Sequence, residues 1–464
     1  MNMEASNTEP MNLPDQTELA KKRDLMQQRV ARSLKRRHAQ EKRFKLMGMS
    51  AVGAALLFVL LLFTTILSKG LPAFWQAHIS LEIYFDEDII QIDEKPVRMA
   101  GETEAAFNQR MLAWQTQLGF VNFNRIILNA ISKEIPEAPE YQRDAMRLVT
   151  SGERFALRSM VEEDPSIIGT TQRLWLLADA NVDVWMKGNI DRDLPDSRQQ
   201  LSARTRAWVD ELEAKGVLKN RFSTALFMNP DSRSSLASAG LAGAFVGSLM
   251  MMLIVMFLAV PIGVASAIYL EEFAPKNKLT DLIEVNINNL AAVPSIVFGL
   301  LGASVFILWF KMPLSAPIVG GLVLTLMTLP TVIIATRSTL KAIPPSIRSA
   351  ALGIGASKVQ SVFHHVLPLA IPGILTGSIL GIAQALGETA PLLLIGMTSF
   401  VASVPATPFD QSTALPVQIY LWQGNELRNF FEARTSAAII VLLALMISLN
   451  AVAIWLRKHF ETRW

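Results

Sequence analysis

The sequence predicts a mainly α-helical, polytopic membrane protein in which six helices cross the bilayer and a large soluble α+β domain is inserted between the first two. Hydrophobic residues make up 51% of the 464 residues, charged residues only 18%, and the mean hydropathy is +0.32. That composition is more apolar than that of an ordinary soluble protein. Most of the acidic residues lie in one stretch between the first two apolar runs, which indicates a water-exposed domain there.

Six apolar runs are long enough to cross a bilayer, which takes about 20 residues of helix. The second run is longer than one helix requires, so we place its span near 242–269. Lys311 alone separates the third run from the fourth. The six runs are 46–67, 234–270, 285–310, 312–336, 366–387 and 435–456.

Basic residues set the expected orientation. Between Lys21 and Lys45 there are 11 Lys and Arg residues against two acids, directly before the first span, so the N-terminus should stay in the cytoplasm. Alternate crossings then put the loop 337–366 and the basic C-terminal tail inside as well, in an inner membrane. That loop carries Arg337, Lys341, Arg348 and Lys358 and no acid. A secretory signal peptide is the alternative for the first 67 residues, but the basic region is too long and no small-residue cleavage site follows.

The segment 390–403 is a possible seventh crossing. Its 14 apolar-leaning residues before Pro405 are more typical of a re-entrant or interfacial segment. A seventh span would also move the basic tail outside. We therefore expect six spans, in the order of a basic segment 1–45, a first helix 46–67, an extracytoplasmic insert 68–233 and a five-helix core 234–464.

The insert should be an α+β domain. Apolar residues alternate through ISLEIYF, at Ile79, Leu81, Ile83 and Phe85, which predicts a half-buried strand. A helix is expected in the stretch 196–218. Asp196 and Ser197 are its candidate caps, Leu201, Ala207, Trp208 and Leu212 its apolar face and Gly216 its stop. The insert lacks the patterns of a hydrolase or phosphate-binding loop, which favours a packing or docking module over a ligand-sensing one.

Several chemistries are excluded by composition. The chain has no cysteine, and its five histidines have no metal-ligand spacing, so we expect neither a metal site nor a catalytic residue. The formal net charge of +3 does not argue for nucleic acid. No G-x-x-x-x-G-K-[ST] sequence occurs, so the chain should bind no cofactor, and any ATP must be bound by another subunit.

The expected cytoplasmic loop has a distinctive outline, RSTLKAIPPSIRSAALGIGASKVQSVFHHVLP. The pair Pro344 and Pro345 should end one helix, and a short helix can run from 346 to 352. Gly353 and Gly355 then permit a sharp bend before the chain returns to the membrane. Such an element could dock in a groove on another protein, or it could be only a solvated basic loop.

The spacing of that loop resembles the segment by which permease subunits of bacterial ABC importers grip their ATPase. The family pattern is E-A-A, three residues, G, nine residues, I, one residue, L-P. Here Ala350, Ala351, Gly355, Leu367 and Pro368 keep the frame. Ser349 stands where the acid is usual, and His365 where a branched apolar residue is usual. The resemblance implies a coupling role for this loop.

The fifth run adds a finer resemblance. ILTGSILGIAQALGETAPLLLIG is similar to the fifth span of phosphate-specific ABC importer permeases, and its GETAPL wording to the PstA type. The likeness covers roughly 240–460 and leaves the insert unexplained. It implies a permease subunit without catalysis of its own that moves inorganic phosphate. Its implied partners are a second permease, a cytoplasmic ATPase dimer and a periplasmic phosphate-binding protein. Molybdate or sulfate remains open as the substrate.

Two sets of residues on the fifth run are candidates for function. Gly373, Gly377, Gly381 and Ala385 recur every fourth position, so another helix can approach that face closely. Glu388 continues the same face. An acid at membrane depth is costly to insert and therefore usually has a function.

An acid repels an anion, so Glu388 suits a gate in which it pairs with a basic residue. Related permeases usually have an arginine where this chain has Gln384, which makes an intersubunit partner more plausible. Arg337, matching another basic family position, could attract an exiting anion or serve only as an anchor. Backbone N–H groups near Pro294 and Ser295 are a weaker anion site. A secondary transporter or a membrane-anchored sensor is a less favoured function, because inverted repeats and a signalling domain are missing.

Overall fold

The computed structural model describes residues 16–397 and 401–460, which form two compact units that divide at residues 65 and 66. The first unit is most of one long helix, α1 (Gln16–Gly70). This helix contains the first predicted span, and its apolar side chains are exposed from Leu46 to Thr65. Such a surface is expected of a helix that faces lipid.

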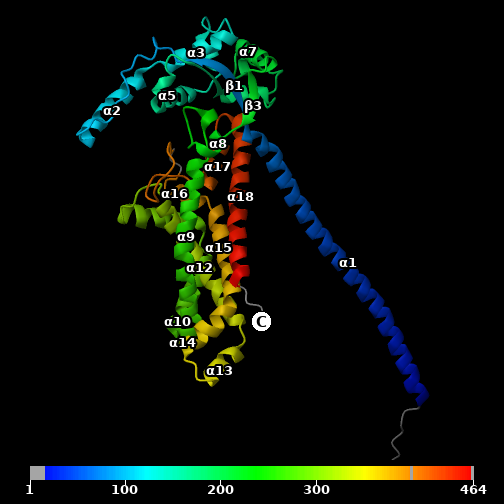
Figure 1. Cartoon of the computed structure of the whole chain (residues 1–464). Coiled ribbons are helices and arrows are strands. Elements are labelled where there is room, and N and C mark those ends of the chain that lie inside the picture. Colours follow the sequence, from blue (N-terminus) through cyan, green and yellow to red (C-terminus); the bar gives the residue numbers. More distant parts are fainter. Residues whose placement is uncertain (1–15, 398–400, 461–464) are drawn as a thin grey trace, which may run out of the picture. The chain divides into compact units, whose positions relative to one another are not determined.

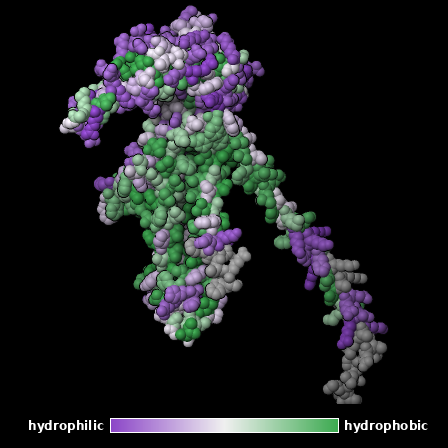
Figure 2. Space-filling view, in the orientation of Figure 1, coloured by the Kyte–Doolittle hydropathy of each residue, from purple (hydrophilic) through white to green (hydrophobic). Residues whose placement is uncertain are grey.

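The second unit begins with the insert, which is built on a three-stranded antiparallel sheet of order β2-β1-β3. Figure 2 shows the insert as a largely hydrophilic body joined to a hydrophobic helical bundle. Its strands are β1 (Trp75–Tyr84), β2 (Thr171–Leu177) and β3 (Leu218–Phe222). Its helices are α2 (Glu104–Phe120), α3 (Phe123–Glu134), α4 (Gln142–Ala145), α5 (Glu153–Glu163), α6 (Ala180–Met186), α7 (Ala203–Ala214) and α8 (Ala225–Met228).

The strand predicted from the alternating pattern is present as the central strand β1. Ile79, Leu81 and Ile83 are buried within it, and Phe85 is buried directly after it. Helix α3 covers this strand and contributes Ile127 and Ile131 to the same core. Burial of alternate side chains against a helix stabilises the sheet on one face.

The helix predicted at 196–218 is shorter than expected. Asp196 and Ser197 do not cap it, because they lie in a separate 3-10 turn, Asp196–Arg198. Ser202 caps α7 instead, since its side chain accepts a hydrogen bond from the backbone N–H of Thr205. Ala207 is exposed, whereas Leu201, Trp208 and Leu212 are buried as predicted. Gly216 takes a left-handed φ of 71° just beyond the helix end.

The rest of the second unit is a helical bundle, and Figure 1 shows its long helices running side by side. We call the end that carries the insert the insert end. The opposite end, near α13 (Pro345–Gly353) and α14 (Lys358–Gln360), is the loop end. The long helices are α9 (Ala242–Ile268), α12 (Pro317–Ala342), α15 (Leu367–Gly387) and α18 (Arg428–Phe460). Shorter elements are the π-helix η5 (Tyr269–Phe273), α10 (Lys278–Ala291), α11 (Ser295–Gly302), the π-helix η6 (Ala303–Trp309), α16 (Ala390–Leu394) and α17 (Leu415–Gln423).

Within residues 16–397 and 401–460, five helices are long and apolar enough to cross a membrane, and there is a sixth span if one bent pair is counted as one. That bent pair corrects the third predicted span. The stretch 285–310 is not one helix, because the chain turns by 100° between α10 and α11. Pro294 explains the break, since it lacks an N–H and disfavours helical geometry in the residue before it.

The fourth predicted span also has different limits, and the possible seventh span, which we did not expect, is not formed in the described residues. The fourth begins at Pro317 rather than 312, because Lys311 and Ser315 take left-handed φ angles of 56° and 62° and interrupt the helix. The possible seventh span contains only the five residues of α16 and no spanning helix within the described part of 390–403. Residues 398–400 of that segment lie outside the described residues.

One buried arginine joins the insert to the bundle. Arg434, near the start of α18, is only 1% exposed. Its guanidinium donates to the carbonyl oxygens of Ala237, at 2.6 Å, and Ala239, which lie in the segment between the insert and α9. The side chain of Gln76, the second residue of β1, also donates to the Ala237 carbonyl, at 2.9 Å. Asp183 of α6 lines the same small cavity as Arg434 and brings a negative charge near it.

We expect Arg434→Met to loosen this junction by about 2 to 4 kcal/mol, because the buried carbonyl oxygen of Ala239 would lose its donor and that of Ala237 would keep only the bond from Gln76. Limited proteolysis of the purified chain should then cleave the segment 229–241 at least about tenfold faster. Arg428→Met is the matched control, since Arg428 is an exposed arginine on the same helix. Equal cleavage rates in the two variants would contradict the assignment.

Candidate functional site

The loop end of the bundle carries a short helix between two reversals of the chain. Helix α12 stops at Ala342, and Pro344 and Pro345 begin α13 (Pro345–Gly353). Gly355 follows in a left-handed conformation with φ of 91°, which a residue with a side chain adopts only with strain. Ser357 then caps α14 (Lys358–Gln360), and the π-helix η7 (Ser361–Val366) leads into α15.

Helix α13 has an inner and an outer face. Ala351 is 4% exposed on the inner face, where Ile347 packs against a small apolar cluster that includes Leu340 and Val366. On the outer side, Leu352 is 51% and Ile354 is 82% exposed. Ser349 and Ala350 are exposed as well. Exposed apolar side chains beside small residues, at a tight turn, make a surface suited to another protein.

The four basic residues of this loop contact acids and an aromatic ring that come from earlier in the chain. Arg337 lies 2.8 Å from a carboxylate oxygen of Glu284 on α10 and 3.3 Å from one of Glu271 on η5. The ammonium group of Lys341 lies 3.7 Å from a carboxylate oxygen of Glu271 and 3.9 Å from one of Glu284. In this conformation Arg337, predicted to attract an anion or to act as an anchor, is neutralised by carboxylates.

The other two cations of the loop also meet η5. Arg348 forms an ion pair of 2.6 Å with Glu272, and the ammonium group of Lys358 lies 5.4 Å from the ring centre of Phe273. Sequence reasoning noted the loop's lack of acids but missed these partners. The only signal was the sequence YLEEF at 269–273, whose acids follow an apolar span directly.

Helix α15 packs closely against α12 through its glycines. A side chain on Gly373 or Gly377 would collide with Thr339 or Ala335 of α12. A methyl group on Gly381 would lie 3.0 Å from the side chain of Thr328. Ala385 is buried one turn further on. These small residues let the two backbones approach each other.

Glu388 sits at the opposite end of α15 from the loop, as its C-terminal cap residue. It is partly exposed, and Gln384, one turn before it, is exposed. Within 16–397 and 401–460 the carboxylate of Glu388 has no hydrogen bond or ion pair. The carbonyl end of a helix carries partial negative charge, so an acid there is unfavourable unless a cation pairs with it. The geometry leaves room for such a partner from outside the chain.

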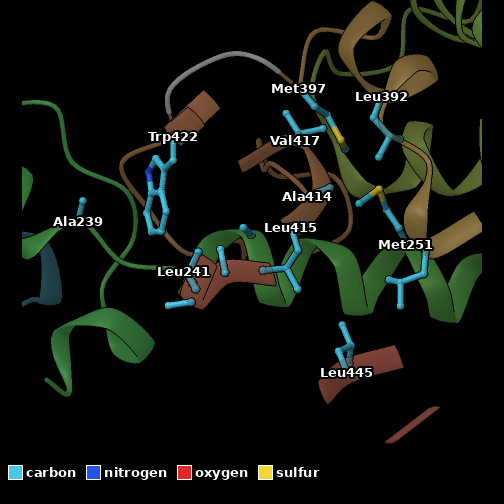
Figure 3. Packing of buried hydrophobic residues seen from close by; sticks show 14 of the residues in the cluster. Ala239, Leu241, Met251, Leu392, Met397, Ala414, Leu415, Val417, Trp422 and Leu445 are labelled. Carbon is cyan, nitrogen blue, oxygen red and sulfur yellow. The ribbon is translucent and has the colours of Figure 1, made fainter. Parts of the chain in front are cut away.

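The segment after Glu388 folds back into the bundle and fixes where α15 ends. Figure 3 shows Leu392 and Met397 of this segment in one apolar cluster with Met251 of α9 and Leu415 of α17. The hydroxyl of Ser315 donates a 2.6 Å hydrogen bond to the Gly396 carbonyl in the same region. The position of Glu388 is therefore set by packing on both sides.

Comparison with known proteins agrees with this arrangement. A probable ABC transporter permease protein, YqgI of Bacillus subtilis, is 30% identical over 245 residues, which are 50% of this chain and 82% of the relative. The family described as binding-protein-dependent transport system inner membrane component matches residues 259–464. The chain belongs to this family.

Other matches refine the picture of the permease. The phosphate transport system permease protein PstA of Yersinia pestis is 31% identical over 53% of this chain and 81% of its own length, which supports a PstA-type permease. A domain family of unknown function, DUF3333, matches 31–196. An inward-facing MetNI methionine ABC transporter structure overlaps 47% of this chain and 95% of its own, at 18% identity and a TM-score of 0.37.

Glu388→Gln tests the charge at the end of α15. We expect substrate uptake by the assembled transporter to fall by about tenfold or more. A neutral amide at position 388 cannot form an ion pair with a cation of another subunit. Insertion and the yield of purified chain should stay normal.

Glu426→Gln is the control, because Glu426 is an exposed acid at the insert end of the same bundle. Unchanged uptake in Glu388→Gln would show that the charge has no role in transport.

Proposed function

We propose that this permease is one half of the membrane passage of an ATP-driven importer for inorganic phosphate. Support for phosphate comes from the PstA-type relatives and from the GETAPL sequence around Glu388. A second permease would supply the other half of the passage. A binding protein outside the membrane would deliver the anion, and a pair of ATPase subunits would drive the cycle.

The proposal includes an orientation. The basic segment 21–45 and the basic loop around α13 both favour the cytoplasm. The insert would then face the periplasm, with both chain ends in the cytoplasm and the core in an inner membrane. An acid-rich soluble domain at one end of an apolar bundle suits this arrangement (Figure 2).

The observation that carries the proposal is the two-faced helix α13. Its inner residue Ala351 is held by the bundle, while Leu352 and Ile354 stand in solvent at the turn. An exposed apolar turn on a loop that packs firmly behind it fits a groove on an ATPase. Since the sequence has no phosphate-binding loop for ATP, the energy for transport would enter through this contact.

The alternative is a permease for another oxyanion, such as molybdate or sulfate. The charge and geometry of a tetrahedral oxyanion are shared by these substrates, so the residues of this chain do not separate them. A secondary transporter or a sensor is disfavoured by the family to which the chain belongs.

The test is reconstitution. The permease, its candidate permease partner, the ATPase and the binding protein are purified together and placed in lipid vesicles. ATP is supplied on the side of the membrane where the ATPase lies. We expect uptake of radiolabelled phosphate that requires ATP and all four components, with little competition from sulfate or molybdate. Uptake by this chain alone, or transport of sulfate in preference to phosphate, would refute the phosphate importer.

Gly355 offers a sharper test of the coupling contact. Gly355→Ala forces a side chain into a left-handed backbone position, at a cost of roughly 1 to 2 kcal/mol, and should distort the turn after α13. ATP hydrolysis should continue while uptake per ATP falls. Both rates can be measured in the same vesicles.

Gly353→Ala is the matched control. Among the described residues, no atom beyond the local backbone and the chain neighbours lies within 4 Å of where a methyl group would stand on either glycine, but only Gly355 of the two has a positive φ. If both variants behave alike, the bend at Gly355 is not part of the coupling.

A further inference from the structure

Arg348 on α13 is the most extensively bonded side chain of the loop. It donates to both carboxylate oxygens of Glu272, with contacts of 2.6, 3.1 and 3.2 Å. The guanidinium also donates at 2.9 Å to two backbone carbonyl oxygens, those of Leu340 and Ile343. One planar side chain therefore uses five contacts to join three separate elements.

Those three elements are the parts that would have to move together. Arg348 belongs to α13, and Glu272 belongs to the π-helix η5, which continues α9. Leu340 lies in the last turn of α12 and Ile343 is its C-terminal cap residue, a place where carbonyl groups lack their regular i+4 helical partners. Glu272 is itself buried, with 9% of its surface exposed, so solvent screens the pair weakly.

The apolar packing beneath α13 could not hold this geometry by itself. The cluster around Leu340, Ile343 and Val362 is small, and hydrophobic contact has no preferred direction. Hydrogen bonds weaken steeply when their angles change, so a fork of bonds from one guanidinium resists sliding and rotation of α13. The position of η5 supports this reading, because π-helical turns are frequent at functional sites.

We propose that Arg348 and Glu272 form a strut that fixes α13 to the ends of α9 and α12, so that these three elements move as one body when α13 is displaced. Both are positioning residues. The inference rests on the proposed function in one respect, namely that a cytoplasmic ATPase acts on α13.

A second ion cluster nearby provides the contrast. Arg337, Lys341, Glu271 and Glu284 tie α12 to η5 and α10, but none of them belongs to α13. Losing a pair in that cluster should leave the link between α13 and the bundle intact. Glu284→Gln is therefore a matched control for Glu272→Gln.

The experiment compares Arg348→Lys and Glu272→Gln with the unaltered chain and with Glu284→Gln, each in the complete reconstituted transporter. Lysine keeps the charge but cannot form the fork. We expect the ATPase to copurify with both strut variants and to hydrolyse ATP, while substrate moved per ATP falls by about tenfold. An unchanged ratio of uptake to hydrolysis in both variants would overturn the strut.

A distance measurement adds a readout that simple destabilisation would not produce. The chain has no cysteine, so spin labels can be attached through Ser346→Cys on α13 and Ile262→Cys on α9 without removing native thiols. In the otherwise unaltered chain the distance between the labels should stay constant when ATP is added. In Arg348→Lys it should change or broaden.

Different results would refute the proposed importer function and the proposed strut. If no ATPase copurifies with the unaltered chain, the proposed importer function fails. If the ATPase copurifies and hydrolyses ATP but the label distance of the otherwise unaltered chain shifts on addition of ATP, the importer stands and the strut is wrong. This second result is accessible even if Arg348→Lys does not fold.

Discussion

A charge withdrawn from water must find its partners within the protein, and at each end of this bundle one arginine meets that requirement. At the insert end, Arg434 is buried against the carbonyl oxygens of Ala237 and Ala239. At the loop end, Arg348 is held by Glu272 and by two carbonyl groups of α12. Both side chains bond to backbone carbonyl groups at or near the end of an element, so each fixes a connection between elements that apolar packing alone would leave loosely oriented.

Between these ends the bundle depends on shape rather than charge. The glycines of α15 admit the threonine and alanine side chains of α12, and close approach of two helices replaces the hydrophobic driving force that lipid does not supply. Such an interface has few alternative packings, because a shift along the axis would bring Gly377 out of register with Ala335. Motion in the permease should therefore occur between groups of helices that are tied at their ends, with α12 and α15 kept together.

The sequence allowed the spans to be predicted because apolar runs report burial in lipid without any knowledge of neighbours. The positions at which the spans are interrupted were harder to predict. Pro294 was visible, but a proline kinks some helices and ends others, and the 100° turn depends on how α11 packs afterwards. The ion pairs of the loop were missed for a related reason. Glu272 and Arg348 are 76 residues apart, and nothing in either local pattern says that the chain brings them together. Glu388 was found because an acid in an apolar run is conspicuous, yet its partner is not among the described residues of this chain.

The attachment of the insert to the bundle also combines apolar packing with directional bonds from a buried arginine. Its apolar side is continuous with the bundle, since Ala180 and Val184 of α6 belong to the same cluster as Phe430 and Phe431 of α18. Arg434 adds a directional bond to that contact, and Trp422 of α17 donates to Asp231 at 3.2 Å beside it. A domain attached only by its two chain ends could swing freely, whereas one that shares a core and a buried arginine with α18 must follow that helix. The insert is therefore held to α18 by a shared apolar core and a buried arginine as well as by its two chain ends.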